Sequence, residues 1–201
     1  SQHFLHIVIL AALYALTGKA GLFLAAQTEF ATVIWPPSGI ALGMLLVYGY
    51  RIWPGVLIGS MMINGHLAGT FVTWDTMMGA KGLGTLLTGC GAALQAVAGR
   101  YMILKIFDFP LQIEKGRDAL CFLLVAGPIS CLFSATMGTA ALYYFLELPI
   151  EQVSTNWMAW WAGDTFGVLA FMPLVLIICS NIDKKFSGKE RGLSPLPMGA
   201  L

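Results

Sequence analysis

The feature that most constrains this fold is a series of six apolar runs, joined by short connections, that fills most of the 201 residues. A helix needs about 20 predominantly apolar residues to cross the roughly 30 Å hydrocarbon core of a bilayer. The chain is 58% hydrophobic and 10% charged, whereas soluble domains carry roughly 25% charged residues. We therefore expect an all-α integral membrane protein, a compact bundle of about six transmembrane helices. The runs are Phe4–Ala26, Pro36–Gly49, Trp53–Leu67, Thr76–Leu104, Asp118–Leu146 and Asn156–Ser180.

The second and third runs are short, and only the residues YRIW separate them. We expect these two runs to form a tight helical hairpin that is not quite as wide as the membrane. Pro36 and Pro54 suit the first turn of a helix, where the backbone N–H has no partner within the helix. The fifth run contains Gly127-Pro128, which predicts a kink there.

The distribution of charge between the runs predicts the orientation in the membrane. Lysine and arginine follow the second, fourth and sixth runs. In the other connections, all charged residues are acidic. Because cytoplasmic loops are enriched in lysine and arginine, both termini are expected to be cytoplasmic. The basic residues are Arg51, Lys105, Lys115, Arg117, Lys184, Lys185, Lys189 and Arg191, and the acidic ones are Glu29, Asp75, Glu147 and Glu151.

Pairs of glycines four residues apart indicate how the helices pack. Such pairs let two helix backbones approach closely inside a membrane. They occur at Gly39/Gly43, Gly55/Gly59 and Gly163/Gly167. A compact intramembrane bundle is enough to explain them, and they do not by themselves indicate a ligand.

Ionisable side chains inside the runs are rare and are therefore candidates for function. At a helix centre they cost about 2.5–3.5 kcal/mol on insertion scales, so they usually face a partner or a water-filled cavity. Asp164 lies about two turns into the sixth run, and helix rise places Lys19 at about the same depth. Lys19 and Asp164 are thus a candidate structural charge pair that would hold two helices together.

Several polar and aromatic residues share the predicted outer half of the membrane with this acid. Together they form a candidate ligand-binding pocket that is partly aromatic and partly charged. For each tryptophan, a place in the aromatic belt at the membrane interface is the alternative. The candidate pocket residues are Trp35, Asn64, Lys81, Trp160, Trp161 and Asp164.

Motifs of soluble enzymes do not occur in the sequence. There is no phosphate-binding Gly-Lys-Ser/Thr loop, no His-Glu-x-x-His and no Gly-x-Ser-x-Gly. We therefore expect no catalytic residues, no metal, no cofactor and no nucleic-acid partner. The four cysteines lie inside apolar runs without Cys-x-x-Cys spacing, which favours packing roles. They are Cys90, Cys121, Cys131 and Cys179.

Two segments of the sequence resemble a known family. WPPSGIALGMLLVYGYRIWPGVLIGSMMIN (residues 35–64) and WWAGDTFGVLAFMPLVL (residues 160–176) resemble the bacterial membrane-associated sensor domain of the first type, of the MASE family. That family shows Trp-Pro-Pro-x-Gly-Ile-Ala, then Arg-x-x-Pro-Gly, and later Trp-Trp-x-Gly-Asp-x-x-Gly followed by a proline. The matching positions are Trp35, Pro36, Pro37, Gly39, Ile40, Ala41, Arg51, Pro54, Gly55, Gly59, Asn64, Trp160, Trp161, Gly163, Asp164, Gly167 and Pro173.

The resemblance implies a sensory input domain in the bacterial inner membrane. In the family it precedes cytoplasmic outputs such as histidine kinases, as in two-component systems, or cyclases. Residues 1–181 would form the transmembrane sensor-like domain, and residues 182–201 a cytoplasmic tail or the lead-in to a further helix. The family module usually has about eight helices, so six runs indicate a truncated portion or a stand-alone relative.

The sequence thus predicts a domain that detects a small ligand or a state of the membrane lipids. It would relay this signal to a cytoplasmic kinase or cyclase output domain by helix rearrangement. Two alternatives remain open at this point. One is an accessory or structural subunit in contact with other subunits of a larger membrane complex. The other is a small-solute transporter, although the sequence shows no convincing inverted repeat.

Overall fold

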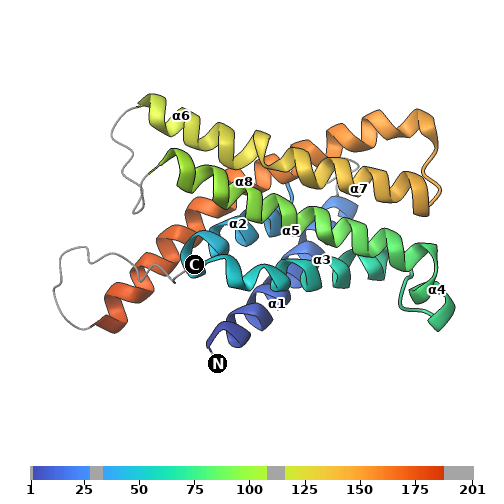
Figure 1. The fold of residues 1–201 in the computed structure, drawn as a ribbon, viewed down its shortest axis with the longest axis horizontal. Coiled ribbons are helices and arrows are strands. Elements are labelled where there is room, and N and C mark those ends of the chain that lie inside the picture. The colour runs from blue at the N-terminus through green and yellow to red at the C-terminus, as the bar shows by residue number, and fades with distance from the viewer. Residues whose placement is uncertain (1, 28–33, 108–115, 188–201) are drawn as a thin grey trace.

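The computed structural model describes residues 2–27, 34–107 and 116–187, and all regular structure in these ranges is helical. The long helices lie side by side in a bundle (Figure 1). The elements are α1 (Gln2–Gln27), α2 (Pro36–Tyr48), the 3₁₀ turn η1 (Tyr50–Ile52), α3 (Trp53–Leu67), α4 (Trp74–Met78), α5 (Ala80–Ile106), α6 (Gly116–Leu124), the π-helical turn η2 (Val125–Ile129), α7 (Cys131–Phe145) and α8 (Ile150–Ser187).

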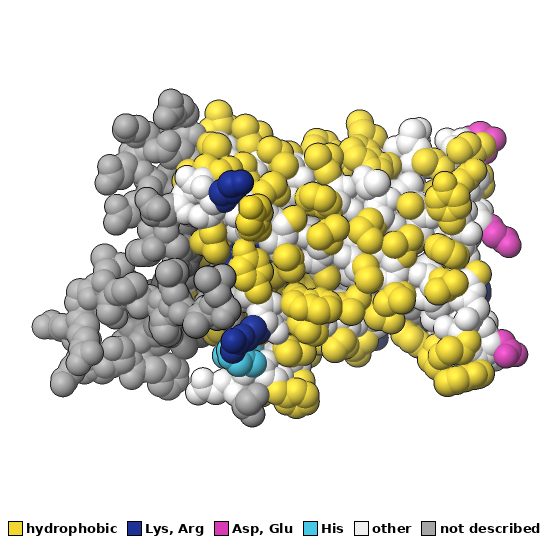
Figure 2. Space-filling model, in the orientation of Figure 1, with side chains coloured by type: hydrophobic (Ala, Val, Ile, Leu, Met, Phe, Trp, Pro, Cys, Tyr) yellow, Lys and Arg dark blue, Asp and Glu magenta, His cyan; other side chains and the backbone are white. Residues whose placement is uncertain are grey.

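Four helical segments are long and apolar enough to cross a membrane, and α2 is a shorter apolar helix. The face in Figure 2 is covered with hydrophobic side chains along its middle, and acidic side chains gather at one end. These observations confirm the prediction of an all-helical integral membrane protein. The four segments are Gln2–Phe23, Ala80–Ile106, Leu120–Phe145 and Ile150–Cys179.

Two helix starts differ by four or more residues from those predicted. The fourth run was expected to begin at Thr76, but Thr76 belongs to the separate short helix α4. A reciprocal capping box between Thr73 and Thr76 ends the preceding loop and starts α4 there. The last helix begins at Ile150 instead of Asn156, because a polar turn with Glu151 near its N-terminus extends it beyond the apolar run.

The short helices α2 and α3 do not pack along one another, so the predicted hairpin is wrong. α2 packs mainly on α8, and α3 packs on α1 and α5. Their glycine faces point to these different neighbours. A Cβ at Gly43 would lie 2.8 Å from the Cβ of Val175 in α8, and one at Gly55 would lie 2.6 Å from the carbonyl oxygen of Ile7 in α1.

Arg100 of α5 binds the C-terminal end of α2. Its Nη1 donates to the carbonyl oxygens of Leu45 and Leu46, the latter at 2.8 Å. The guanidinium also lies over the Tyr50 ring, 4.6 Å from the ring centroid. The last carbonyls of a helix have no partner within it, and a cation there is favourable. Arg100 therefore lets α2 end within the bundle after 13 residues.

The fifth run loses α-helical geometry where the kink was predicted. Pro128 lies in η2, the π-helical turn between α6 and α7. Proline lacks the N–H that would bond to the preceding turn, which explains the irregularity. The carbonyl oxygen of Pro128 accepts a hydrogen bond from the indole of Trp161 at 2.8 Å.

The predicted boundary between residues 181 and 182 falls inside α8, which continues to Ser187. Residues 188–201 of the predicted tail lie outside the described residues, and so do four of the charged residues used to predict the orientation. These are Glu29, Lys115, Lys189 and Arg191.

Candidate functional site

The start of α2 is docked on the middle of α8. The backbone N–H of Trp35 donates to the carbonyl oxygen of Gly163 at 2.8 Å. The Ser38 hydroxyl contacts the carbonyl oxygens of Asp164 at 2.9 Å and of Trp35 at 2.8 Å. Any Cβ at Gly167 would overlap the Trp35 carbonyl, so only glycine permits this approach. The two segments that carry the sequence motifs therefore meet here.

Asp164 lies at this junction and is almost completely buried, with 2% of its surface exposed. The Ser134 hydroxyl of α7 donates a hydrogen bond to its Oδ2. The side chain of Trp160, one turn earlier in α8, also hydrogen-bonds to this carboxyl group. These two hydrogen bonds replace part of the contacts with water that the Asp164 carboxyl loses on burial.

The structure does not bring the predicted charge pair together. The Lys19 side chain is exposed on α1, and no ion pair joins it to Asp164. Helix rise fixes the depth of a residue but not the direction in which its side chain points. The two residues can therefore share a depth without meeting.

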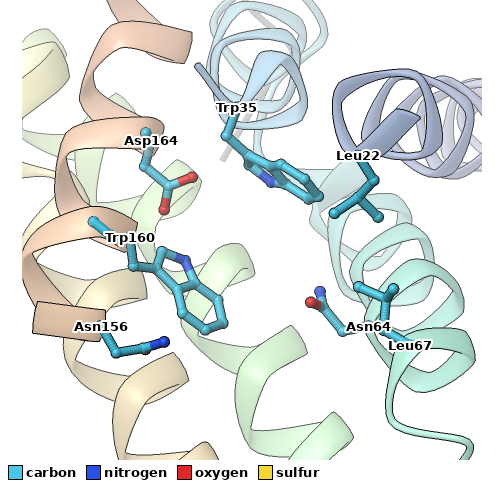
Figure 3. Close-up of a pocket in the computed structure, with 9 residues that line it drawn as sticks. Leu22, Trp35, Asn64, Leu67, Asn156, Trp160 and Asp164 are labelled. Carbon is cyan, nitrogen blue, oxygen red and sulfur yellow. The ribbon is translucent and has the colours of Figure 1, made fainter. Parts of the chain in front are cut away.

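A cavity of about 300 Å³ lies beside Asp164, between α1, α3 and α8 (Figure 3). Its walls are mostly apolar, with a few polar groups, as in most small-molecule sites. Four of the six predicted pocket residues line it, namely Trp35, Asn64, Trp160 and Asp164. The lining is completed by Leu22, Leu67, Asn156, Ala159 and Gly163.

The other two predicted pocket residues lie elsewhere. Lys81 is exposed near the start of α5, and its backbone carbonyl accepts a hydrogen bond from Thr70 at 3.3 Å. Trp161 faces away from the cavity and donates to Pro128. Neighbours in a helix point about 100° apart, and here Trp160 faces the cavity while Trp161 is directed to the carbonyl of Pro128.

Asn156 is a cavity residue that the sequence analysis did not include. It lies four residues before Trp160 and eight before Asp164, the spacing at which side chains share one helix face. That spacing was the signal that could have identified it. Leu22 and Leu67 carry no comparable signal, because apolar residues fill most helix positions in this chain.

The two amide side chains are held in defined orientations. Asn64 Nδ2 donates to the Ser60 carbonyl at 3.0 Å and to the Ser60 hydroxyl at 3.2 Å, which leaves Asn64 Oδ1 available. Asn156 Oδ1 accepts from the Thr139 hydroxyl at 3.3 Å, which leaves Asn156 Nδ2 available. Both amides point toward the space between the labelled residues in Figure 3.

The polar groups that line the cavity are a carboxyl, two side-chain amides and the indole groups of two tryptophans. Across the described ranges, no group of three or more His, Cys, Asp and Glu side chains could hold a metal ion.

Comparison with known proteins gives one match. The model of the family described as MASE1 matches residues 6–197, nearly the whole chain. Both motif segments fall inside the matched range. Searches among curated proteins and among solved structures found no match.

Proposed function

Since the chain belongs to the MASE1 family of non-catalytic membrane sensor domains, we propose that it is a sensory input domain that binds a small ligand in the cavity beside Asp164. Binding changes the packing of the surrounding helices. α8 carries this change to a cytoplasmic output, such as a kinase or cyclase domain, at the bacterial inner membrane.

The observation that carries this proposal is the position of Asp164. The residue is buried at the α2–α8 junction and also lines a cavity. Intramembrane acids are costly, and they usually mark functional sites. A ligand that contacts the cavity walls touches α1, α3 and α8 together, so its binding changes how these helices pack.

The course of α8 supports the proposed relay. α8 runs as one helix from Ile150 to Ser187, so the cavity residues and the opposite end of the bundle belong to one element (Figure 1). A continuous helix is a suitable element for passing a shift from one end to the other, and Pro173, between the cavity residues and the C-terminal end, is where α8 can bend. We propose that its C-terminal end is cytoplasmic, in a bundle of six membrane-crossing helices with both termini on that side.

The test uses a fusion protein in which the C-terminus of the full chain, beyond α8, is linked to the catalytic domain of a diguanylate cyclase. Cyclase product is measured in membranes that contain equal amounts of each variant. Asp164→Asn keeps the side-chain size but removes the charge, and we expect it to shift cyclase output. Asp75→Asn is the matched control, because Asp75 is exposed in α4 and lies away from the cavity.

Cyclase output from Asp75→Asn should equal that from the wild type. If Asp164→Asn also left the output unchanged, the proposed sensing role of the cavity would be wrong. Such a result would favour a structural subunit of a larger membrane complex.

A further inference from the structure

The cavity contains one ionisable group, the carboxyl of Asp164, and no basic side chain among its lining residues. Ser134 and Trp160 give this carboxyl hydrogen bonds but no positive charge. A buried carboxylate is costly unless a positive charge accompanies it, because burial removes its hydration. The electrostatics of the site therefore favour a cationic ligand.

The positive side chains of the described bundle do not supply that charge. Lys19 and Lys81 are both exposed and form no ion pair with Asp164. Arg100 is engaged at the far end of α2 with the carbonyls of Leu45 and Leu46. Among the described residues, no positive side chain pairs with Asp164, and a cationic ligand would supply a charge opposite to that of its carboxylate.

Two further features of the cavity suit a cation that carries N–H groups. The rings of Trp35 and Trp160 lie on either side of the space beside Asp164 (Figure 3). Tryptophan is the aromatic side chain that attracts cations most strongly. Asn64 Oδ1 adds a second acceptor, because the amide nitrogen of Asn64 is used by Ser60. The carboxyl and this amide oxygen lie on opposite sides of the cavity (Figure 3), so the carboxyl is the contact for an ammonium group.

The remaining walls define the body of the ligand. Leu22, Leu67 and Ala159 present apolar surface. The volume of about 300 Å³ is at the lower end of the range for small-molecule sites. A short alkyl or aryl chain fits such walls better than a second charged group does.

We propose that the cavity beside Asp164 binds a small primary ammonium compound with an apolar body. Its ammonium group contacts Asp164, and its body lies against the tryptophan rings and the leucines. This inference rests on the proposed function, since it names the ligand class of that sensory site. A free amine and the ethanolamine head group of a phospholipid share this chemistry.

The first experiment compares three compounds with one carbon skeleton and different head groups. Phenethylamine is cationic, 2-phenylethanol is neutral and phenylacetate is anionic. Each is titrated into the purified full chain in detergent by calorimetry, and the melting temperature is followed in parallel, because a ligand of the folded state raises it. We expect binding by phenethylamine only, and n-butylamine serves as a second, slimmer amine.

Variants test the contact with the carboxyl group. Asp164→Asn should weaken phenethylamine binding roughly 10- to 100-fold, the loss typical of a hydrogen bond to a charged group. Asp75→Asn should bind as the wild type does. The proposal would be overturned by equal binding of the alcohol or the anion, by an unchanged affinity in Asp164→Asn, or by a failure of both the amines and the ethanolamine lipid described next to bind.

A second experiment distinguishes the two sources of the ammonium group. The chain is placed in nanodiscs of phosphatidylglycerol alone or mixed with phosphatidylethanolamine. A higher melting temperature with phosphatidylethanolamine in the wild type, but not in Asp164→Asn, identifies the lipid as the source. If lipid composition has no effect while phenethylamine binds, the source is a free amine.

Failure of this inference can be told apart from failure of the proposed function. If Asp164→Asn changes cyclase output but neither amines nor the ethanolamine lipid bind, the sensory function stands and the ligand class is wrong. If amines bind and Asp164→Asn leaves cyclase output unchanged, the ligand class stands and the sensory function is wrong.

Discussion

At the scale of single residues, the contact between Asp164 and Ser134 decides how an acid is accommodated in this bundle. The Ser134 hydroxyl donates to the buried carboxyl, and both residues are nearly inaccessible. The sequence identified Asp164 as important, because an intramembrane acid is costly. It did not identify Ser134, since a serine in a membrane helix can donate to the carbonyl of the preceding turn instead, and Ser134 Oγ also lies 3.1 Å from the Cys131 carbonyl oxygen.

Replacing Ser134 by alanine is expected to destabilise the folded protein. The change removes a donor from a buried carboxyl, which typically costs about 1–3 kcal/mol. The melting temperature of the purified chain should fall, and the fall should be smaller in an Asp164→Asn background, because the two residues are coupled.

Ser154→Ala is the matched control for this effect, since Ser154 is exposed in the first turns of α8. Its melting temperature should match that of the wild type. Additive effects of Ser134→Ala and Asp164→Asn would contradict the coupling.

At the scale of elements, the approach of α2 to α8 positions the site. The sequence predicted close helix contacts from the glycine pairs, and the structure confirms them at Gly39/Gly43, at Gly55/Gly59 and at Gly167. At Gly163 the carbonyl accepts the Trp35 N–H. The sequence could not predict which helices would be partners, because a glycine pair marks a close approach without specifying the neighbour. The same ambiguity led to the incorrect hairpin of α2 and α3.

Gly167→Ala is expected to loosen the α2–α8 contact. The added methyl group would overlap the Trp35 carbonyl, which is backbone and cannot move independently of α2. Overpacking of this kind typically costs about 1–3 kcal/mol, although alanine has the higher helix propensity. The measurement is the melting temperature, together with deuterium exchange of the backbone in α2.

Gly18→Ala in α1 provides the comparison for this substitution. Its added Cβ would meet only side-chain atoms, the nearest being Ile63 Cγ1 at 3.3 Å. A melting temperature that dropped as far for Gly18→Ala as for Gly167→Ala would contradict the specific role of the α2–α8 contact.

At the scale of the whole molecule, the distribution of charge should set the orientation. The acidic side chains visible in Figure 2 gather at one end of the bundle, and the most prominent lysine and arginine side chains lie toward the other end. Most helix boundaries could be predicted from the apolar runs, because the length of an apolar run is set by membrane thickness. The arrangement of those helices could not, since it depends on side-chain directions around each axis.

Labelling of intact cells should verify the orientation. Asp75→Cys is expected to react with a membrane-impermeant maleimide from outside, since Asp75 is exposed near the acidic end. Lys105→Cys, near the end of α5, is expected to react only after lysis. The unmodified chain, with its four cysteines, gives the background. The reverse labelling pattern would contradict cytoplasmic termini.

The docking of α2 on α8 also has a consequence for biogenesis. The hydrogen bond from Ser38 to the Asp164 backbone joins residues that are 126 positions apart. At about 5–20 residues per second, a ribosome needs roughly 6–25 s to make that stretch. During this time α2, with its 13 residues, has no α8 to cover its glycine face. The packing of α2 is therefore completed only after synthesis of α8, which is the last of the described helices to leave the ribosome.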